Sequence, residues 1–136
     1  RYLFLQNNQF NSLNTFTGLN ILLYFYVHNN NISGTIPDFS GCPKLIRLYL
    51  HNNSFSTYFS GSFVTLTSIK LILLQNNNLT STEINNIIRD LFDNYGNFNR
   101  SGVAVNLADN SPPTGDEVID KLNFLKNIAG WSITTD

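Results

Sequence analysis

The chain has 136 residues, a length that suits one domain, and its hydrophobic content of 42% with 13% aromatic residues is sufficient for a core. Its formal net charge is -1, only 12% of its residues are charged, and lysine and arginine form no cluster. This balance argues against nucleic-acid binding, which depends on neutralising phosphates. Because no apolar run approaches the roughly 20 residues of a membrane span, we expect no membrane insertion. The single cysteine, Cys42, excludes an internal disulfide and is expected to fill a small buried site.

A short pattern, apolar-x-apolar-x-x-Asn-x-apolar, recurs from the start of the chain. Its apolar pairs are Leu3 and Leu5, Phe25 and Val27, Leu48 and Leu50, and Ile72 and Leu74. Looser copies begin at Val105, where Pro112 replaces the closing apolar residue, and at Trp131, where Asp136 takes the asparagine position. The alternation predicts a short strand with one buried face in each copy. Strands this short must stack to share a continuous core.

The asparagine of the pattern is predicted to be structural. It follows each strand, where its side-chain amide can bond backbone groups that the bend leaves unpaired. Stacking the copies would align these residues in a buried ladder, made of Asn8, Asn30, Asn53, Asn77 and Asn110.

The segments between the first four strands are expected to form an irregular outer wall. Residues 11–20 are polar with Phe16 and Leu19 as apolar anchors. Residues 32–45 contain two prolines and two glycines, which forbid a regular helix and predict extended or turn-like structure. The next segment supplies an apolar wall from Phe55, Tyr58, Phe59, Phe63, Leu66 and Ile69.

After Leu79 the outer segments change to helical patterns. A capping box at residues 80–83 precedes apolar residues at helical spacing, which predicts a helix from about Ser81 to Asn94 and a loop at residues 95–102. A second box at residues 114–117 predicts another helix that ends near Gly130. Its inward residues would be Val118, Ile119, Leu122 and Leu125.

Over essentially its whole length the chain resembles leucine-rich repeat proteins, since most of the copies recur at the 20 to 29 residues typical of such repeats. The resemblance implies an α/β fold, a right-handed solenoid with a parallel concave sheet, an irregular outer wall in the first repeats and helices in the last two. We divide it into repeats over residues 1–79 and a helix-backed C-terminal cap over residues 80–136. The chain opens inside a repeat, so we expect it to be the C-terminal part of a longer protein.

Two pieces indicate a narrower resemblance. The Ser-Gly-Thr-Ile-Pro run at residues 33–37 resembles a repeat type familiar from plants that also occurs in bacterial and phage proteins. Residues 106–115 and 130–136 resemble the closing segment of leucine-rich repeat proteins from tailed phages and Bacteroidetes-type bacteria, although Pro112 and Pro113 depart from the usual single proline. This resemblance implies a virion appendage or a bacterial surface protein.

The candidate binding site is the concave face, because residues between the buried apolar pairs point there. We expect neighbouring columns across the six strands, with Phe4, Tyr26, Tyr49, Leu73, Asn106 and Ser132 in the middle one. Aromatic side chains gather on the first three strands, and exposed aromatics beside polar groups suit recognition of protein or sugar. The predicted recognition patch consists of Tyr2, Phe4, Tyr24, Tyr26, His28, Arg47, Tyr49 and His51.

Other interpretations of these residues are weaker. The aromatics could merely stabilise the sheet as cross-strand pairs. His28 and His51 would lie on adjacent strands, but without a carboxylate or thiolate they make a poor metal site, so no metal and no cofactor is expected. The sequence has no paired carboxylates in a strand column, no Gly-x-Ser-x-Gly and no phosphate loop, and we expect no enzymatic activity.

Three functions remain open. The first is a non-catalytic recognition or adhesion module on a virion appendage or bacterial surface, which binds a protein or cell-surface glycan. The second is a structural component of a virion or surface assembly, in several copies, whose concave face is buried in a subunit contact. The third, weaker one is a eukaryotic receptor ectodomain, which the Ser-Gly-Thr-Ile-Pro run favours. All three place the protein on a virion or outside a cell.

Overall fold

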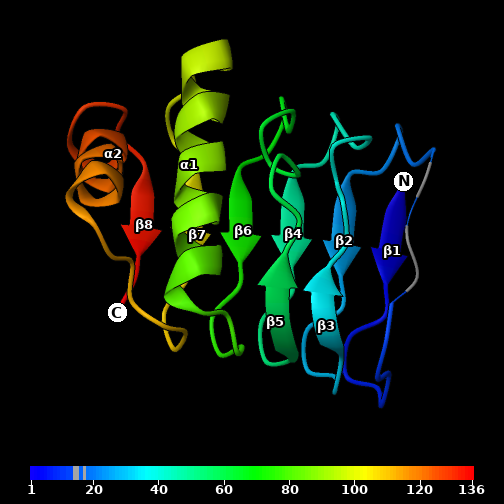
Figure 1. The fold of residues 1–136 in the computed structure, drawn as a ribbon. Helices are drawn as coiled ribbons and strands as arrows, with labels where there is room; N and C mark the ends of the chain where they lie inside the picture. Colours follow the sequence, from blue (N-terminus) through cyan, green and yellow to red (C-terminus); the bar gives the residue numbers. More distant parts are fainter. Residues whose placement is uncertain (14–15, 17) are drawn as a thin grey trace.

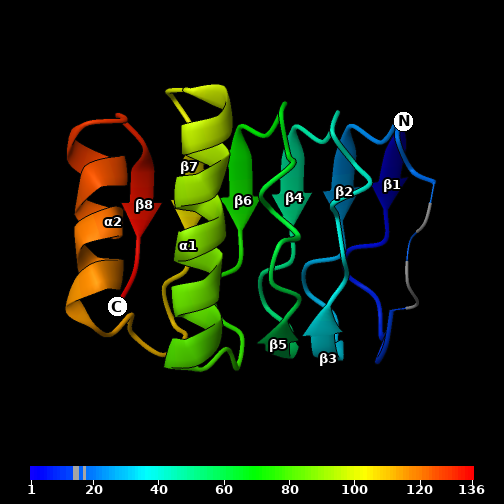
Figure 2. The same cartoon turned by 45° about the horizontal axis from the view of Figure 1, so that its top comes forward.

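The computed structural model describes residues 1–136 except 14, 15 and 17, and its centre is a parallel sheet. Six strands follow one another in the order β1-β2-β4-β6-β7-β8 (Figure 1). Their bounds are Tyr2–Phe4, Tyr24–Tyr26, Arg47–Tyr49, Leu71–Leu73, Ala104–Asn106 and Ser132–Thr134. On one side of this sheet lie β3 (Ser33–Ile36), β5 (Ser54–Tyr58), α1 (Ser81–Phe98) and α2 (Asp116–Asn127), as the turned view also shows (Figure 2). The core fills the space between these two layers, and we call the opposite, uncovered side of the sheet the concave face.

The apolar pairs of the repeated pattern form the core, as their spacing predicts. Phe25, Leu48 and Ile72 are fully buried and pair with one another in register across β2, β4 and β6. On the edge strand β1, Leu3 and Leu5 are only partly buried, because they have a neighbouring strand on one side alone. Each strand has only three residues, so the stacking of neighbours rather than strand length creates the buried layer.

The last strand is shifted by two residues from the predicted alignment. Ile133 pairs with Val105, and Trp131 precedes the strand at the level of Val103. Ser132 therefore lies beside Ala104 rather than Asn106, and Gly130 lies outside the strand. The Trp131 indole donates a hydrogen bond to the carbonyl of Arg100 at 2.7 Å, and this anchor fixes the register. Asp136 consequently does not take the asparagine position that the pattern assigns to it.

The asparagines of the pattern join neighbouring repeats in both directions. The amide nitrogen of Asn53 donates to Leu50 O in its own repeat and to Val27 O in the preceding one, each at 3.1 Å. Its side-chain oxygen accepts from the backbone N–H of Ile32 at 3.0 Å. The same pattern of donors and acceptor recurs at Asn30, Asn77 and Asn110.

The predicted burial of this ladder is too general. Asn77 is 7% exposed, Asn30, Asn53 and Asn110 are half-buried, and Asn8 is exposed. Asn8 lies in the edge repeat and donates only to the carbonyls of Leu5 and Gln6. A repeat on each side therefore shields the side chain in part, and of these asparagines Asn77 alone is buried.

A second row of amides, which the repeated pattern does not single out, lies beside the first. The residue before each ladder asparagine has a left-handed backbone, with φ between 54° and 58° at Asn7, Asn29, Asn52, Asn76 and Asp109. Asparagine and aspartate tolerate this conformation better than other non-glycine residues. The side chains of Asn7, Asn29, Asn52 and Asn76 form a chain of hydrogen bonds across the repeats, with lengths of 2.6 to 3.1 Å. These asparagines are exposed.

The outer wall is extended in the first repeats, as the prolines and glycines predict. Strands β3 and β5 pair in parallel, and the hydroxyls of Thr35 and Thr57 lie 2.7 Å apart. Cys42 is buried in this wall as expected. Phe59 differs from the prediction because it is 54% exposed and leaves the apolar wall to its neighbours. In the expected segment 11–20, Phe16 and Leu19 pack against the core and are partly buried. Residues 14, 15 and 17 of this segment lie outside the described residues.

The helices replace this wall in the last repeats, but their ends differ from the prediction. Helix α1 continues to Phe98, four residues beyond the predicted end, because Asn99 rather than Gly96 takes the left-handed C-cap conformation, with φ 44°. At its start, Thr80 makes no side-chain cap and instead donates to the Glu83 carboxylate. Helix α2 begins after Gly115, so the predicted capping box at Thr114 is absent, and Ile119 is 36% exposed rather than inward.

Helix α1 is fixed to the third repeat by buried polar contacts. Asp90 accepts from the Tyr58 hydroxyl at 2.5 Å and from the N–H of Gly61 at 2.7 Å. Asn94 donates to the carbonyl of Phe63 at 3.1 Å and is fully buried. Burial raises the pKa of Asp90. These contacts place the helix over β5 and the core beneath it.

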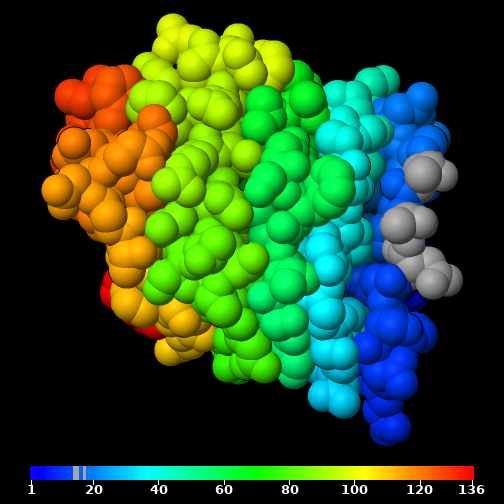
Figure 3. All heavy atoms as spheres, in the orientation of Figure 1, coloured from blue at the N-terminus to red at the C-terminus, as the bar shows by residue number. Residues whose placement is uncertain are grey.

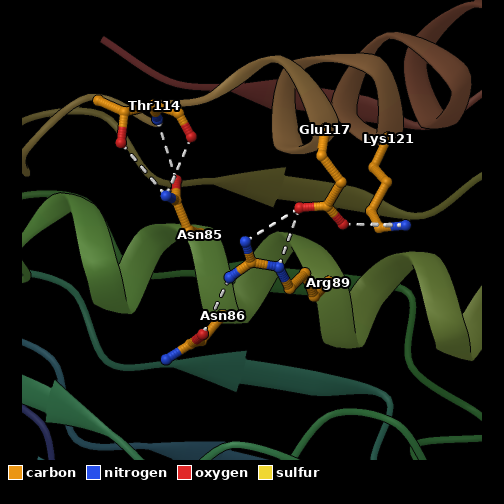
Figure 4. Close-up of polar contacts among 6 residues, drawn as sticks. All are labelled: Asn85, Asn86, Arg89, Thr114, Glu117 and Lys121. Atoms are coloured by element: carbon orange, nitrogen blue, oxygen red, sulfur yellow. Dashed lines mark hydrogen bonds and ion pairs between the residues drawn. The ribbon is translucent and has the colours of Figure 1, made fainter.

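Helix α2 contacts α1 through a polar cluster near its start (Figure 4). Thr114 N–H donates to Asn85 Oδ1 at 3.0 Å. Arg89 bonds Glu117 at 2.9 Å, and Glu117 also pairs with Lys121 at 3.1 Å. None of the helices in the described part of the chain is both long and apolar enough to cross a membrane.

Candidate functional site

The concave face carries three columns of side chains on β1, β2, β4 and β6. The first column, at the start of the strands, contains Tyr2, Tyr24, Arg47 and Leu71. The second, at their ends, contains Phe4, Tyr26, Tyr49 and Leu73. The third follows the strands and contains Gln6, His28, His51 and Gln75. All eight residues of the predicted recognition patch thus lie together on three adjacent strands.

The rings of the second column are stacked on one another. Phe4 and Tyr26 have centroids 4.9 Å apart, and Tyr26 and Tyr49 have centroids 4.1 Å apart with planes only 6° apart. Because β1 and β4 lie on opposite sides of β2, both faces of the Tyr26 ring are covered. The central rings therefore present their edges and hydroxyl groups, not their faces, to a partner.

The first column repeats this arrangement with a cation. Tyr2 covers one side of Tyr24 at 5.0 Å between centroids, and the Arg47 guanidinium carbon lies 5.3 Å from the Tyr24 centroid on the other. The neighbouring phenol of Tyr26 raises the pKa of Arg47. The open ring faces belong to Tyr2 and Phe4 on the edge strand, which are 56% and 52% exposed. Figure 3 shows the side of the molecule opposite to the concave face, where the successive repeats form parallel bands across the outer wall.

Comparison with protein families gives matches in the middle of the chain. Residues 38–79 match a model described as leucine rich repeat, and residues 22–42 match a second model of the same description. These residues include β2 to β6 and their asparagines. The fold is a leucine-rich repeat solenoid. A search of curated proteins found no match to the chain.

Leucine-rich repeat domains generally mediate protein–protein interactions and are typically non-catalytic. The concave face of this solenoid fits that general role, because it offers rigid aromatic area beside polar groups.

In the third column of the solenoid, the two histidines stack on each other. The His28 and His51 rings are 4.4 Å apart between centroids, with planes 11° apart. Burial lowers the pKa of both side chains, and burial together with the charge of His28 lowers the pKa of His51 to about 4. Both rings are therefore neutral at pH 7. The described residues include no group of three or more His, Cys, Asp or Glu side chains suited to a metal ion.

Two glutamines extend this column beyond the predicted patch. Gln6 Oε1 and Gln75 Oε1, like Nδ1 of both histidines, are buried atoms without a hydrogen-bond partner among the described residues. The sequence indicates their position, because Gln6 and Gln75 follow Phe4 and Leu73 by two residues, as His28 and His51 follow Tyr26 and Tyr49. They form a polar border along the aromatic columns.

Proposed function

We propose that the concave face of β1, β2 and β4 is a recognition surface for a protein partner, and that the domain is a non-catalytic module on a virion appendage or a cell surface. The observation that supports a protein rather than a sugar is the stacking of Phe4, Tyr26 and Tyr49. Sugars stack on open aromatic faces, which here belong to Tyr2 and Phe4 on the edge strand, whereas the central faces are covered by neighbouring rings. Edges and hydroxyls of tyrosine instead suit the mixed apolar and polar contacts of protein interfaces.

The virion or surface location rests on the closing segment of the chain. Residues 106–115 and 130–136 resemble the end of phage and Bacteroidetes leucine-rich repeat proteins. In the fold these residues comprise the last residue of β7, the loop before α2, and β8, and β8 lies at the edge of the sheet far from the aromatic columns. The recognition surface and the closing segment are thus separate parts of the sheet.

The test is selection of a displayed random-peptide library and screening of a glycan array with the purified domain. Tyr49→Ala should weaken peptide binding by about tenfold or more, the usual effect of losing an aromatic at the centre of an interface. Phe59→Ala removes an exposed aromatic from the outer wall and should leave binding unchanged. Glycan binding alone, or peptide binding that Tyr49→Ala leaves intact, would contradict the proposal.

A structural role in an assembly is the second candidate. The concave face carries little charge: its three columns on β1, β2, β4 and β6 include one charged side chain. This favours the assembly role, because permanent interfaces are more apolar than transient ones. Sedimentation of the domain over a range of concentrations distinguishes the two. Self-association that Tyr49→Ala abolishes would favour the assembly role, and a monomer at all concentrations would favour recognition of another protein.

A further inference from the structure

Arg47 is the one charged side chain in the three columns that β1, β2, β4 and β6 present on the concave face. Its side chain is exposed. Among the described residues, the ion pairs are those of Arg89 and Lys121 with Glu117 on the helices, and Arg47 takes part in none. Its strand neighbours are Tyr24 on β2 and Leu71 on β6, neither of which carries charge. The positive charge is therefore not neutralised by the domain itself.

The guanidinium is nevertheless positioned by its surroundings. It lies 5.3 Å from the centroid of the Tyr24 ring, within the range of a cation–π contact. Tyr49 lies two residues along β4 from Arg47, and Tyr26 pairs with Tyr49 on β2, so both phenols lie on the same face as the guanidinium, one position further along the strands. Tyr26 and Tyr49 are themselves fixed against each other by stacking at 4.1 Å. A planar guanidinium held this way loses little freedom when it binds an anion.

We propose that Arg47, with the hydroxyl groups of Tyr26 and Tyr49, binds a carboxylate of the protein partner. This inference rests on the proposed recognition function. A guanidinium matches a carboxylate with two parallel hydrogen bonds, and the two hydroxyls can donate to the same oxygens. One positive charge balances a carboxylate, whereas a phosphate carries close to two negative charges and would need a further cation. The carboxylate belongs to an Asp or Glu side chain or to the C-terminus of the partner.

The experiment uses an array of synthetic peptides taken from the library selection. Each peptide is made in four forms: the selected sequence, the same sequence with Asp or Glu replaced by Asn or Gln, and both of these with an amidated C-terminus. The domain is tested as parent, Arg47→Gln, Arg47→Lys and Arg89→Gln. Arg89→Gln is the matched control, since it removes one exposed arginine from α1 and alters net charge equally. Melting temperatures verify that all four are folded.

The expected result is that Arg47→Gln weakens binding about tenfold to a hundredfold, the usual loss for a hydrogen-bonded charge, while Arg89→Gln binds like the parent. Arg47→Lys should recover only part of the affinity, because an ammonium lacks the fork. Loss on Asp/Glu replacement identifies a side-chain carboxylate, and loss on amidation identifies a chain end.

Peptides that depend on Tyr49 but bind Arg47→Gln as tightly as the parent would overturn the carboxylate site and leave the recognition function standing. Selected peptides without a carboxylate preference would do the same. If no selected peptide depends on Tyr49, both proposals are wrong.

Discussion

The asparagines that follow the strands show how one side chain can link two repeats. Asn53 bonds three carbonyls and one N–H, and the three carbonyls belong to two different repeats. A leucine of similar size fills the same space but makes none of these bonds. The unpaired backbone groups would then remain in a half-buried setting at a cost in folding free energy.

Asn53→Leu should therefore lower the free energy of unfolding by about 1 to 3 kcal/mol, measured by chemical denaturation. Asn8→Leu is the matched control: the same change in the edge repeat, where the side chain is exposed and bonds only its own repeat. It should cost much less. Equal denaturation midpoints for Asn53→Leu and the parent would show that the ladder contributes nothing to stability.

The stacked histidines predict acid sensitivity. The pKa of His51 in the folded protein is about 4, below the unfolded value near 6.5, and burial is the main cause. Between these two pH values the unfolded chain binds more protons than the folded one, so the free energy of unfolding falls as pH decreases from about 6.5 to about 4. Below pH 4 this group causes little further change in stability. Burial also lowers the pKa of His28, which acts in the same direction.

The measurement is the melting temperature of the parent and of His28→Gln/His51→Gln as a function of pH. Glutamine already occupies this column at Gln6 and Gln75, so the double variant extends a row that the fold accommodates. Its melting temperature should fall less between pH 6.5 and 4 than that of the parent. Parallel pH curves for the two proteins would rule out the histidines as the source of acid sensitivity.

At the scale of the elements, the junction between the extended wall and the helices depends on Tyr58. Its hydroxyl at the end of β5 donates to Asp90 on α1 and accepts from the N–H of Phe63 at 3.1 Å. Burial, followed by the charge of Asp90, raises the pKa of Tyr58, so this hydroxyl keeps its proton. The contact joins the last extended segment to the first helix.

Tyr58→Phe should destabilise the domain by about 1 to 3 kcal/mol in chemical denaturation, because Asp90 loses a donor while it stays buried. Tyr95→Phe on α1 removes a phenol hydroxyl for which the described contacts include no hydrogen bond, and it should be nearly neutral. If both variants denature at the same midpoint, the Tyr58–Asp90 contact does not stabilise the junction.

At the scale of the whole molecule, stability should vary along the solenoid, because each repeat contacts only its neighbours. The backbone N–H groups of Leu5 and Leu50 occupy corresponding positions in their repeats and can be compared directly. Leu5 N–H bonds Tyr26 O and Leu50 N–H bonds Leu73 O, both at 2.8 Å. Leu5 belongs to the edge repeat, whereas Leu50 has a repeat on each side.

Native-state hydrogen exchange followed by NMR should therefore show faster exchange for Leu5 than for Leu50. Since the two hydrogen bonds have the same length, the difference would report the opening of the edge repeat and not the strength of the bond. Equal rates would mean that the solenoid opens as a single cooperative unit.

The sequence by itself determined the repeated unit, since the apolar pairs and asparagines of residues 3–79 specify a three-residue strand, a buried column and a linking amide in each copy. It also determined the aromatic surface, because strand alternation places Tyr26 and Tyr49 on the same face whatever their contacts. These features depend on local period and on neighbours that repeat at nearly constant spacing.

Tertiary structure decided the features that depend on a single distant partner. The Trp131 bond to Arg100 shifted β8 by two residues, and Asn99 rather than Gly96 ended α1. The stacking that covers the central ring faces, and the position of Arg47 beside Tyr24, arise from rotamers that three adjacent strands select together. A pattern read along one strand contains no information about such choices, because their energy comes from side chains that meet only when the repeats stack.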